Sequence, residues 1–251
     1  MKYAFAGDRQ ISCDILKKLI VEGFNPSALI VSSGKNETHA NKLIAISGLD
    51  KDKILYGNEI KKSKGVNLLK SLSLDYILGI HFPYIIPTTI LDIPKIGFLN
   101  LHPAYLPYNK GWHTPSWAII DNTPYGATLH FMTEKLDEGA IVHQLKIEVE
   151  KTDTANSLYN KVLKLEKKVF FEALPNLVSL NPRKIKQVGK GTSHSKKDLS
   201  KIQEIDLNEY ILTSKLLDKL RALRTNNPSE LPFFMDRGKR IGIKIDFEIM
   251  D

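Results

Sequence analysis

The sequence predicts an α/β fold built on a parallel sheet, with a small C-terminal helix and β-hairpin added to it. Short apolar runs alternate with amphipathic stretches through the first hundred residues, which is the pattern of strand, helix, strand, helix. Two further alternating segments and a long amphipathic helix follow after residue 125. Ligands of parallel sheets bind beyond the carboxyl ends of the strands. We therefore expect functional loops after residues 6, 80 and 101.

The first half of the chain is expected to form five strands joined by helices. The expected strands are 2–6, 28–31, 54–56, 76–80 and 97–101. The first helix presents Ile15, Leu16 and Leu19 on one face and ends near Gly23, and two more are expected over 40–46 and around 66–72. The turn at residues 7–10 matches neither G-x-G-x-x-G nor a P-loop, which argues against a dinucleotide or ATP site there.

In the second half, strands are expected over 127–132 and 141–149, around a polar loop at 134–139. A helix over 154–177 comes next, and then an exposed connection over 181–201 that is rich in Lys, Gly and Ser. A helix over 209–223 and a hairpin with strands 231–235 and 240–249 complete the chain. The expected organisation is a catalytic domain (1–180), a connection (181–207) and a C-terminal extension (208–251).

One face of the expected hairpin is strongly apolar, because isoleucine or phenylalanine occupies every second position from 241 to 249. A chain of this size does not need that surface for its own core. The sequence therefore predicts a homodimer joined through the hairpin.

Composition and charge narrow the class of protein. The 251 residues contain one cysteine, Cys13, so no internal disulfide can form, and we expect a buried Cys13 in a cytoplasmic protein. No apolar run approaches the ~20 residues that cross a membrane, and the polar start differs from a secretory signal. Of the net charge of +8, residues 151–251 carry +7. This basic third would attract RNA or small anionic substrates, and the charge alone does not choose between them.

The residues best suited to chemistry lie at the end of the strand 97–101. Asn100 and His102 are two residues apart, so their side chains emerge on the same face, and Pro103 ends the strand. Asp137 follows in the loop between two later strands. A carboxylate beside an imidazole favours a general base, and an amide donor can stabilise an oxyanion. The set suits acyl transfer, although structural roles for Asn100 and His102 stay open at this point.

An ordered set of motifs resembles the 10-formyltetrahydrofolate-dependent formyltransferases over residues 75–145. The motifs are N-x-H-P at 100–103, LP at 106–107, KG at 110–111, P-x-W-A-I at 115–119, GATLH at 126–130 and L-D-x-G-x-I at 136–141. The resemblance implies a Rossmann-like formyltransferase domain with Asn100, His102 and Asp137 as the catalytic residues. It also implies 10-formyltetrahydrofolate as co-substrate and no metal. The loop that holds the pteridine ring falls on His81, Phe82, Pro83, Ile85 and Ile86, with Leu136 and Asp137 closing the other side.

Within this family, the sequence most resembles the sugar N-formyltransferases, which modify nucleotide-linked amino sugars for surface polysaccharides such as lipopolysaccharide O-antigen. The loop 105–112 and the tail 220–234 carry this likeness. The candidate substrate contacts are Arg9, Tyr105, Lys110, Gly111, Trp112, Arg221, Phe233 and Phe234. For the aromatic residues core packing competes with this role, and for the arginines a surface position does.

The expected acceptor is dTDP-4-amino-4,6-dideoxyglucose, and the alternative is a dTDP-3-amino-3,6-dideoxyhexose. A methionyl-tRNA formyltransferase-like or RNA-binding protein is the remaining alternative. The aromatic residues are not interleaved with the basic runs, so the sequence favours the sugar over nucleic acid. We expect no membrane partner.

Overall fold

The computed structural model describes residues 1–250, apart from the side chain of residue 36, and the chain divides into two compact units. The first comprises residues 1–102, 128–143 and 166–187, and the second comprises 103–127, 144–165 and 188–250. Strands β7 and β8 and helix α6 contribute residues to both units. Each unit is described by itself below.

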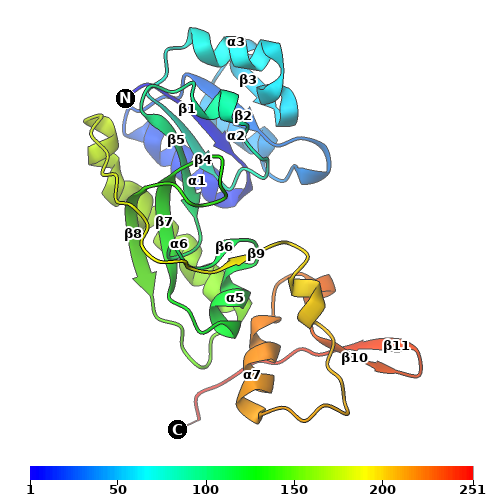
Figure 1. Ribbon diagram of the computed structural model, residues 1–251. Coiled ribbons are helices and arrows are strands. Elements are labelled where there is room, and N and C mark those ends of the chain that lie inside the picture. The colour runs from blue at the N-terminus through cyan, green and yellow to red at the C-terminus, as the bar shows by residue number, and fades with distance from the viewer. Residues whose placement is uncertain (251) are drawn as a thin grey trace. The chain divides into compact units, whose positions relative to one another are not determined.

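The first unit contains most of a seven-stranded sheet in the order β3-β2-β1-β4-β5-β7-β8 (Figure 1). The strands are β1 (Tyr3–Gly7), β2 (Ala28–Val31), β3 (Ile54–Tyr56), β4 (Tyr76–Ile80), β5 (Gly97–His102), β7 (Tyr125–Phe131) and β8 (Ile141–Ile147). The helices are α1 (Arg9–Val21), η1 (Gly34–Asn36), α2 (Ala40–Ser47), η2 (Lys51–Lys53), η3 (Gly57–Lys61), α3 (Ser63–Ser71), α4 (Thr88–Leu91) and α6 (Ala155–Val178).

The pairing of the strands confirms the predicted parallel sheet over five strands, whereas the antiparallel pairing of β7 was not predicted. Strands β3, β2, β1, β4 and β5 pair in parallel, and β7 pairs antiparallel to β5. Every residue of β1, β2 and β4 is buried, which explains why these strands read as unbroken apolar runs. The register places Asn100 opposite Gly79 on β4 and opposite His130 on β7. The ends of three strands therefore meet beside Asn100.

The second unit is built around a small core of Trp117, Leu199 and Leu223. Its elements are β6 (Lys110–Gly111), α5 (Thr114–Ile120), β9 (Ser193–His194), η4 (Leu199–Ile202), α7 (Thr213–Ala222), η5 (Pro228–Glu230), β10 (Phe233–Asp236) and β11 (Lys239–Gly242). Strands β6 and β9 pair in parallel, and β10 and β11 form the predicted hairpin.

Two sequence-based expectations for the second unit are wrong in detail. The second hairpin strand, expected to reach residue 249, ends at Gly242, since the next pairing position on the other strand is Pro232, which has no N–H to donate. The helix expected from residue 209 begins at Thr213. Upstream of it, the amide of Asn208 donates to the carboxylate of Asp206, and this turn competes with the helix.

The segment 181–201 is more structured than an exposed connection. Its residues include strand β9 and the start of η4, and Leu199 is buried in the core of the second unit. Gly191, at φ +65°, packs so closely that a Cβ there would lie 1.9 Å from the carbonyl oxygen of Pro107. Gly191, one of the glycines on which the prediction of an exposed connection rested, thus serves close packing.

Candidate functional site

Asn100, His102 and Asp137 all belong to the first unit, and the fold brings them together. The last residue of β5 is His102, and its Nε2 atom lies 3.5 Å from Oδ2 of Asp137. Both residues are more than nine-tenths buried. A distance of 3.5 Å is longer than an ideal hydrogen bond, but catalytic contacts are often loose before substrate binds. The geometry fits a carboxylate that orients an imidazole.

The loop that carries Asp137 is held through contacts to its backbone. Asp137 adopts a left-handed conformation at φ +53°. Nε2 of Gln187 donates to the carbonyl oxygens of Asp137 and Gly139, at 2.8 Å each. A Cβ at Gly139 would lie 1.8 Å from the carbonyl oxygen of Phe131, so only glycine fits there. Gly139 belongs to the L-D-x-G-x-I motif, whereas Gln187 could not be predicted as an anchor, because it lies in a segment interpreted as a connection.

His130, the last residue of the GATLH motif, is a further member of this cluster. Its ring makes a structural hydrogen bond, since Nδ1 lies 2.8 Å from the carbonyl oxygen of Phe131 and must donate to it. The other ring nitrogen, Nε2, lies 3.5 Å from Oδ1 of Asp137 and 3.4 Å from Nδ2 of Asn100. His130 therefore contacts two of the three catalytic candidates Asn100, His102 and Asp137, which we call the trio. Its position opposite Asn100 in the sheet could be inferred only once strand pairing was known.

The arrangement provides the groups that acyl transfer requires. An imidazole accepts a proton, a carboxylate fixes that imidazole, and an amide N–H next to them can donate to a developing oxyanion. The side chains are fixed on a strand end and on a loop tied by hydrogen bonds, so little reorganisation is needed when substrate binds.

The loop 79–86 begins with the last two residues of β4 and continues beyond the strand in the same unit. Its first side chain after the strand, His81, pairs with Glu166 on α6, and the hydroxyl of Tyr84 lies 3.1 Å from both backbone groups of Ser33. Phe82 stacks beside Tyr84 with ring centroids 4.9 Å apart, and Pro83 is half-buried. The loop is thus anchored at His81 and at Tyr84.

Two apolar side chains of the predicted pteridine site face solvent. Ile85 is 86% exposed and Leu136 is 61% exposed, which is unusual for side chains of this kind. Just beyond the loop, the hydroxyl of Thr88 donates to Glu134 at 2.9 Å, so the segments that carry Ile85 and Leu136 are directly connected. Ile86 is different, because it is buried in the core of the unit and holds the loop down.

The candidate substrate contacts belong to both units. Arg9 is the first residue of α1 in the first unit, with φ +70° and a half-exposed guanidinium 4.0 Å from buried Asp8. The others lie in the second unit. Lys110 and Gly111 form β6, Lys110 is buried, and the ring of Tyr105 has the ammonium of Lys146 4.9 Å from its centroid.

Trp112 is the most accessible of these candidate contacts on the loop, with 47% of its surface exposed. Nζ of Lys196 lies 5.1 Å from its ring centroid, so a cation already covers part of the indole. The neighbouring residue His113 lies 3.9 Å from Glu230. Burial lowers the pKa of His113, and the positive charge of Lys196 adds to this although Glu230 opposes it.

The segment around β9 supports this loop within the second unit. Backbone amides of Lys110 and Trp112 donate to the carbonyl oxygens of Thr192 and His194. The imidazole of His194 stacks on Trp117, with centroids 3.7 Å apart and planes within 4°, and its Nε2 lies 2.7 Å from Asp121. We refer to residues 191–196 as the support segment.

On the C-terminal side, Phe233 and Phe234 are half-buried on β10, and Arg240 lies over the ring of Phe233 at 4.5 Å. Arg221 requires a correction. It is 5% exposed, its Nε donates to Asp218, and its Nη1 donates to the carbonyl oxygens of Glu150 and Asp153. Its guanidinium fastens α7 to the turn before α6, so we remove it from the candidate substrate contacts.

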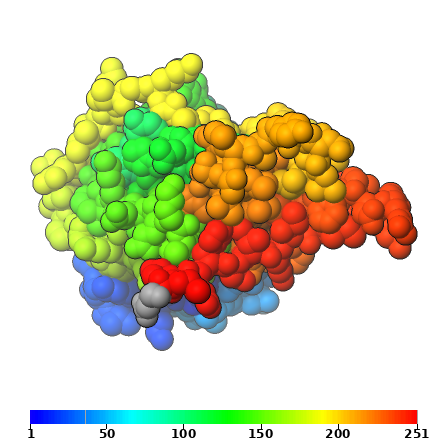
Figure 2. All heavy atoms as spheres, turned by 90° about the horizontal axis from the view of Figure 1, so that it is seen from below, coloured from blue at the N-terminus to red at the C-terminus, as the bar shows by residue number. Residues whose placement is uncertain are grey.

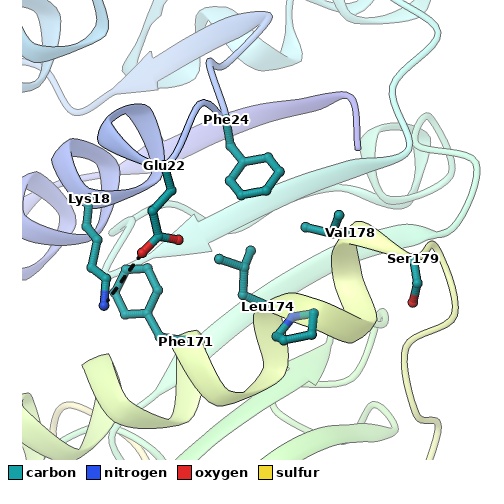
Figure 3. Close-up of a pocket in the computed structure, with 8 residues that line it drawn as sticks. Lys18, Glu22, Phe24, Phe171, Leu174, Val178 and Ser179 are labelled. Carbon is teal, nitrogen blue, oxygen red and sulfur yellow. Dashed lines mark ion pairs between the residues drawn. The ribbon is translucent and has the colours of Figure 1, made fainter.

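Elsewhere in the first unit, α1 and α6 enclose an open groove of about 550 Å³ (Figure 3). Phe24, Phe171, Leu174 and Val178 give it an apolar lining, and the Lys18–Glu22 ion pair lies at its edge. None of the catalytic candidates lines it. Within residues 1–250, no group of three or more His, Cys, Asp or Glu side chains is arranged so that it could hold a metal ion, and no helix is long and apolar enough to span a membrane.

Comparison with known proteins identifies two family domains. Residues 12–174 match the formyl transferase family, and residues 198–249 match the N-formyltransferase dimerization C-terminal domain.

Among relatives, dTDP-4-amino-4,6-dideoxyglucose formyltransferase of Mycobacterium tuberculosis is 27% identical over 69% of this chain and 74% of its own length. The methionyl-tRNA formyltransferase of Francisella philomiragia is 30% identical over 100% of this chain and 80% of its own length. Bifunctional polymyxin resistance protein ArnA of Wigglesworthia glossinidia brevipalpis is 30% identical over 93% of this chain, which spans only 36% of ArnA.

Among solved structures, a 4-N formyltransferase from Francisella tularensis superposes with a TM-score of 0.83 at 25% identity, covering 99% of this chain and 98% of the other. A sugar N-formyltransferase from a Shewanella species superposes with a TM-score of 0.86 at 22% identity, covering 100% and 99%. At that identity the second likeness shows a shared fold.

Proposed function

The chain belongs to the formyl transferase family, and on this premise we propose that it transfers a formyl group from 10-formyltetrahydrofolate to the amine of a nucleotide-linked amino sugar. The observation that carries the proposal is the cluster of Asn100, His102 and Asp137 at the carboxyl end of β5. It combines a base, a carboxylate that orients it and an oxyanion donor.

In the proposed reaction, the neutral sugar amine forms a bond to the formyl carbon, and the side-chain amide of Asn100 donates to the oxygen that becomes negative. His102 takes a proton from the amine nitrogen as this bond forms, and Asp137 stabilises the imidazolium that results. When the intermediate collapses, the bond between the formyl carbon and N10 of the folate breaks, and His102 returns the proton to that nitrogen. The products are a formamide and tetrahydrofolate.

We propose that the folate ring lies against the loop 79–86. The exposed side chains of Ile85 and Leu136 support this, because an aromatic ring would cover them, while the anchored backbone between His81 and Tyr84 supplies hydrogen-bonding groups. Ile86 stabilises the loop from the core side.

For the acceptor, we propose dTDP-4-amino-4,6-dideoxyglucose, with a 3-amino-3,6-dideoxyhexose as the alternative position of the amine. A relative that acts on the 4-amino sugar, and the likeness to a 4-N formyltransferase at 25% identity, support the first choice. The exposed face of Trp112 suits a nucleobase. A role in surface polysaccharide synthesis in the cytoplasm stays a prediction.

We also propose that two copies associate through the C-terminal region, whose surface runs from orange to red in Figure 2. It exposes several large apolar side chains, namely Tyr210, Leu212, Leu217, Met235, Ile241 and Ile249. Such a surface is typical of an interface between copies. Sedimentation that yields a monomer at micromolar concentration would contradict this part of the proposal.

The proposed function is tested by tetrahydrofolate formation with 10-formyltetrahydrofolate and a panel of dTDP- and UDP-linked 3-amino and 4-amino sugars. We expect turnover with one sugar and loss of turnover in His102→Ala. Turnover with methionyl-tRNA and with none of the sugars would assign the chain to the other acceptor class. The folate and trio assignments would then stand, and the sugar assignment would fail.

A further inference from the structure

A buried ion pair holds His81, the first residue of the loop 79–86 beyond β4. His81 follows the last residue of β4, and its Nε2 lies 2.9 Å and 3.0 Å from the two carboxylate oxygens of Glu166 on α6. The Glu166 side chain is 0% exposed and that of His81 is 11% exposed. Buried ionised groups are costly unless they are paired, so each of these side chains constrains the other.

The backbone at His81 requires such a constraint. It has φ +51°, in the left-handed region that non-glycine residues seldom adopt, and this turns the chain sharply out of the sheet. The preceding carbonyl oxygen, of Ile80, accepts from the hydroxyl of Ser12 at 2.6 Å. The strand end is therefore fixed, and the His81 side chain is the first point beyond it at which the loop is held.

The charges that face His81 come from two elements. Glu166 lies on α6, and Asp8 and Arg9 lie at the start of α1. Burial lowers the pKa of His81, but the charge and hydrogen bond of Glu166 raise it by more, with a smaller opposing effect of Arg9, so that the net pKa lies above its ordinary value. This balance favours an imidazolium paired with a carboxylate.

We propose that Glu166 is a positioning residue for the one-carbon donor, because its pairing with His81 fixes the loop against which the folate ring binds. This inference rests on the proposed function. Stability alone does not account for the pair, since replacing a buried ion pair by apolar side chains of similar volume is often neutral or stabilising. A need to fix the backbone at this one residue does account for it.

The same helix provides a matched control. Glu172 on α6 pairs with His143 on β8 at 2.8 Å, but this pair is partly exposed, with 43% of the Glu172 side chain accessible, and it does not anchor the loop 79–86. Both pairs join a histidine Nε2 to a glutamate of α6. A change from glutamate to glutamine at the two positions therefore differs mainly in burial and in the attached loop.

The experiment measures the dissociation constants of 5-formyltetrahydrofolate and of dTDP by calorimetry, between pH 6 and 9. We expect Glu166→Gln to raise the folate constant about tenfold and leave the dTDP constant unchanged, whereas Glu172→Gln changes neither. In the unmodified protein, folate binding should weaken as the pH rises through the pKa of His81, because the imidazolium is lost above it. This alkaline weakening should be absent in Glu166→Gln.

The double variant His81→Phe with Glu166→Leu addresses folding, because it removes both charges and keeps an apolar contact. We expect a thermal midpoint close to that of the unmodified protein and folate binding weakened about as much as in Glu166→Gln. If both variants bind folate as the unmodified protein does, the inference is overturned and the proposed function stands. If the unmodified protein itself binds no folate, the proposed function is overturned, and this inference with it.

Discussion

The imidazole of His130 lies 3.5 Å, by its Nε2 atom, from Oδ1 of Asp137, so the carboxylate that faces His102 with its other oxygen contacts a second imidazole. The ring of His130 is fixed by the donation of Nδ1 to Phe131. One carboxylate thus contacts two histidines whose rings are nearly perpendicular, with centroids 6.2 Å apart.

Replacing Asp137 by asparagine should lower kcat by about 10²–10⁴, the range typical of general base catalysis, because His102 loses the charge that stabilises its protonated form. KM for both substrates should change little. Steady-state kinetics of tetrahydrofolate formation measure this, with Glu138→Gln on the same loop as a control that keeps full activity. An Asp137→Asn enzyme with unchanged kcat would remove Asp137 from the proposed mechanism.

Replacing His130 by phenylalanine should lower kcat about tenfold or more and leave folate affinity unchanged. The phenyl ring retains the bulk but cannot contact the amide of Asn100 or the carboxylate of Asp137. The melting temperature should be measured alongside, because the hydrogen bond to Phe131 is also lost. A variant that loses stability but keeps its kcat would show that His130 is only structural.

Replacing Gly139 by alanine should reduce both kcat and the melting temperature. The new Cβ would lie 1.8 Å from a backbone oxygen, so the loop that carries Asp137 must move. Gly242→Ala is the matched control, since a Cβ at that position would meet no contact within 4 Å among the described residues beyond its chain neighbours. Thermal unfolding and kinetics of the two variants should differ clearly, and equal behaviour would contradict the role assigned to Gly139.

Replacing His194 by alanine should raise KM for the nucleotide sugar several-fold and leave KM for the folate unchanged. The variant loses the stacking on Trp117 and the ion pair with Asp121, and with them part of the support segment that holds Lys110 and Trp112. Ser193→Ala, at an exposed side chain of the same strand, should behave like the unmodified enzyme. A rise in both KM values would indicate general damage to the fold.

Stability should depend on pH through Asp153. Burial acts to raise the pKa of the Asp153 carboxyl. Hydrogen bonds from Lys161, from Ser157 and from the backbone of Glu150 lower it by more, so the net pKa lies below its ordinary value. A lowered pKa contributes stability above the unfolded-state value, and this is lost as the pH falls through the folded-state value.

Asp153→Asn should therefore reduce the free energy of unfolding at pH 7 by about 1.5–3 kcal/mol, the range for hydrogen bonds to charged groups. The difference from the unmodified protein should shrink as the pH falls towards 3. Urea unfolding at several pH values measures it. A penalty that does not depend on pH would contradict the assignment to the carboxylate charge.

The order and type of the main elements were predictable because burial leaves a direct signature in the residues. β2, β3 and β4 begin and end where their apolar runs do, and the long helix α6 differs from its prediction by one residue at each end. The placement of Asn100 and His102 on the same face of β5 also followed from strand periodicity. Local interactions determine these features, so a local pattern can predict them.

Contacts between segments far apart in the sequence were not predictable in this way. Gln187 holds the Asp137 loop, Glu166 pairs with His81, and His194 stacks on Trp117, yet the local pattern places each in a helix face or a connection. Arg221 was expected to reach a diphosphate and is instead buried against backbone oxygens. By itself, the sequence determined the parallel strands of the sheet, the imidazole, carboxylate and amide of the trio, and the family. Only the tertiary structure decided which other side chains hold and orient the trio and its loops, because that depends on strand register and on burial between distant segments.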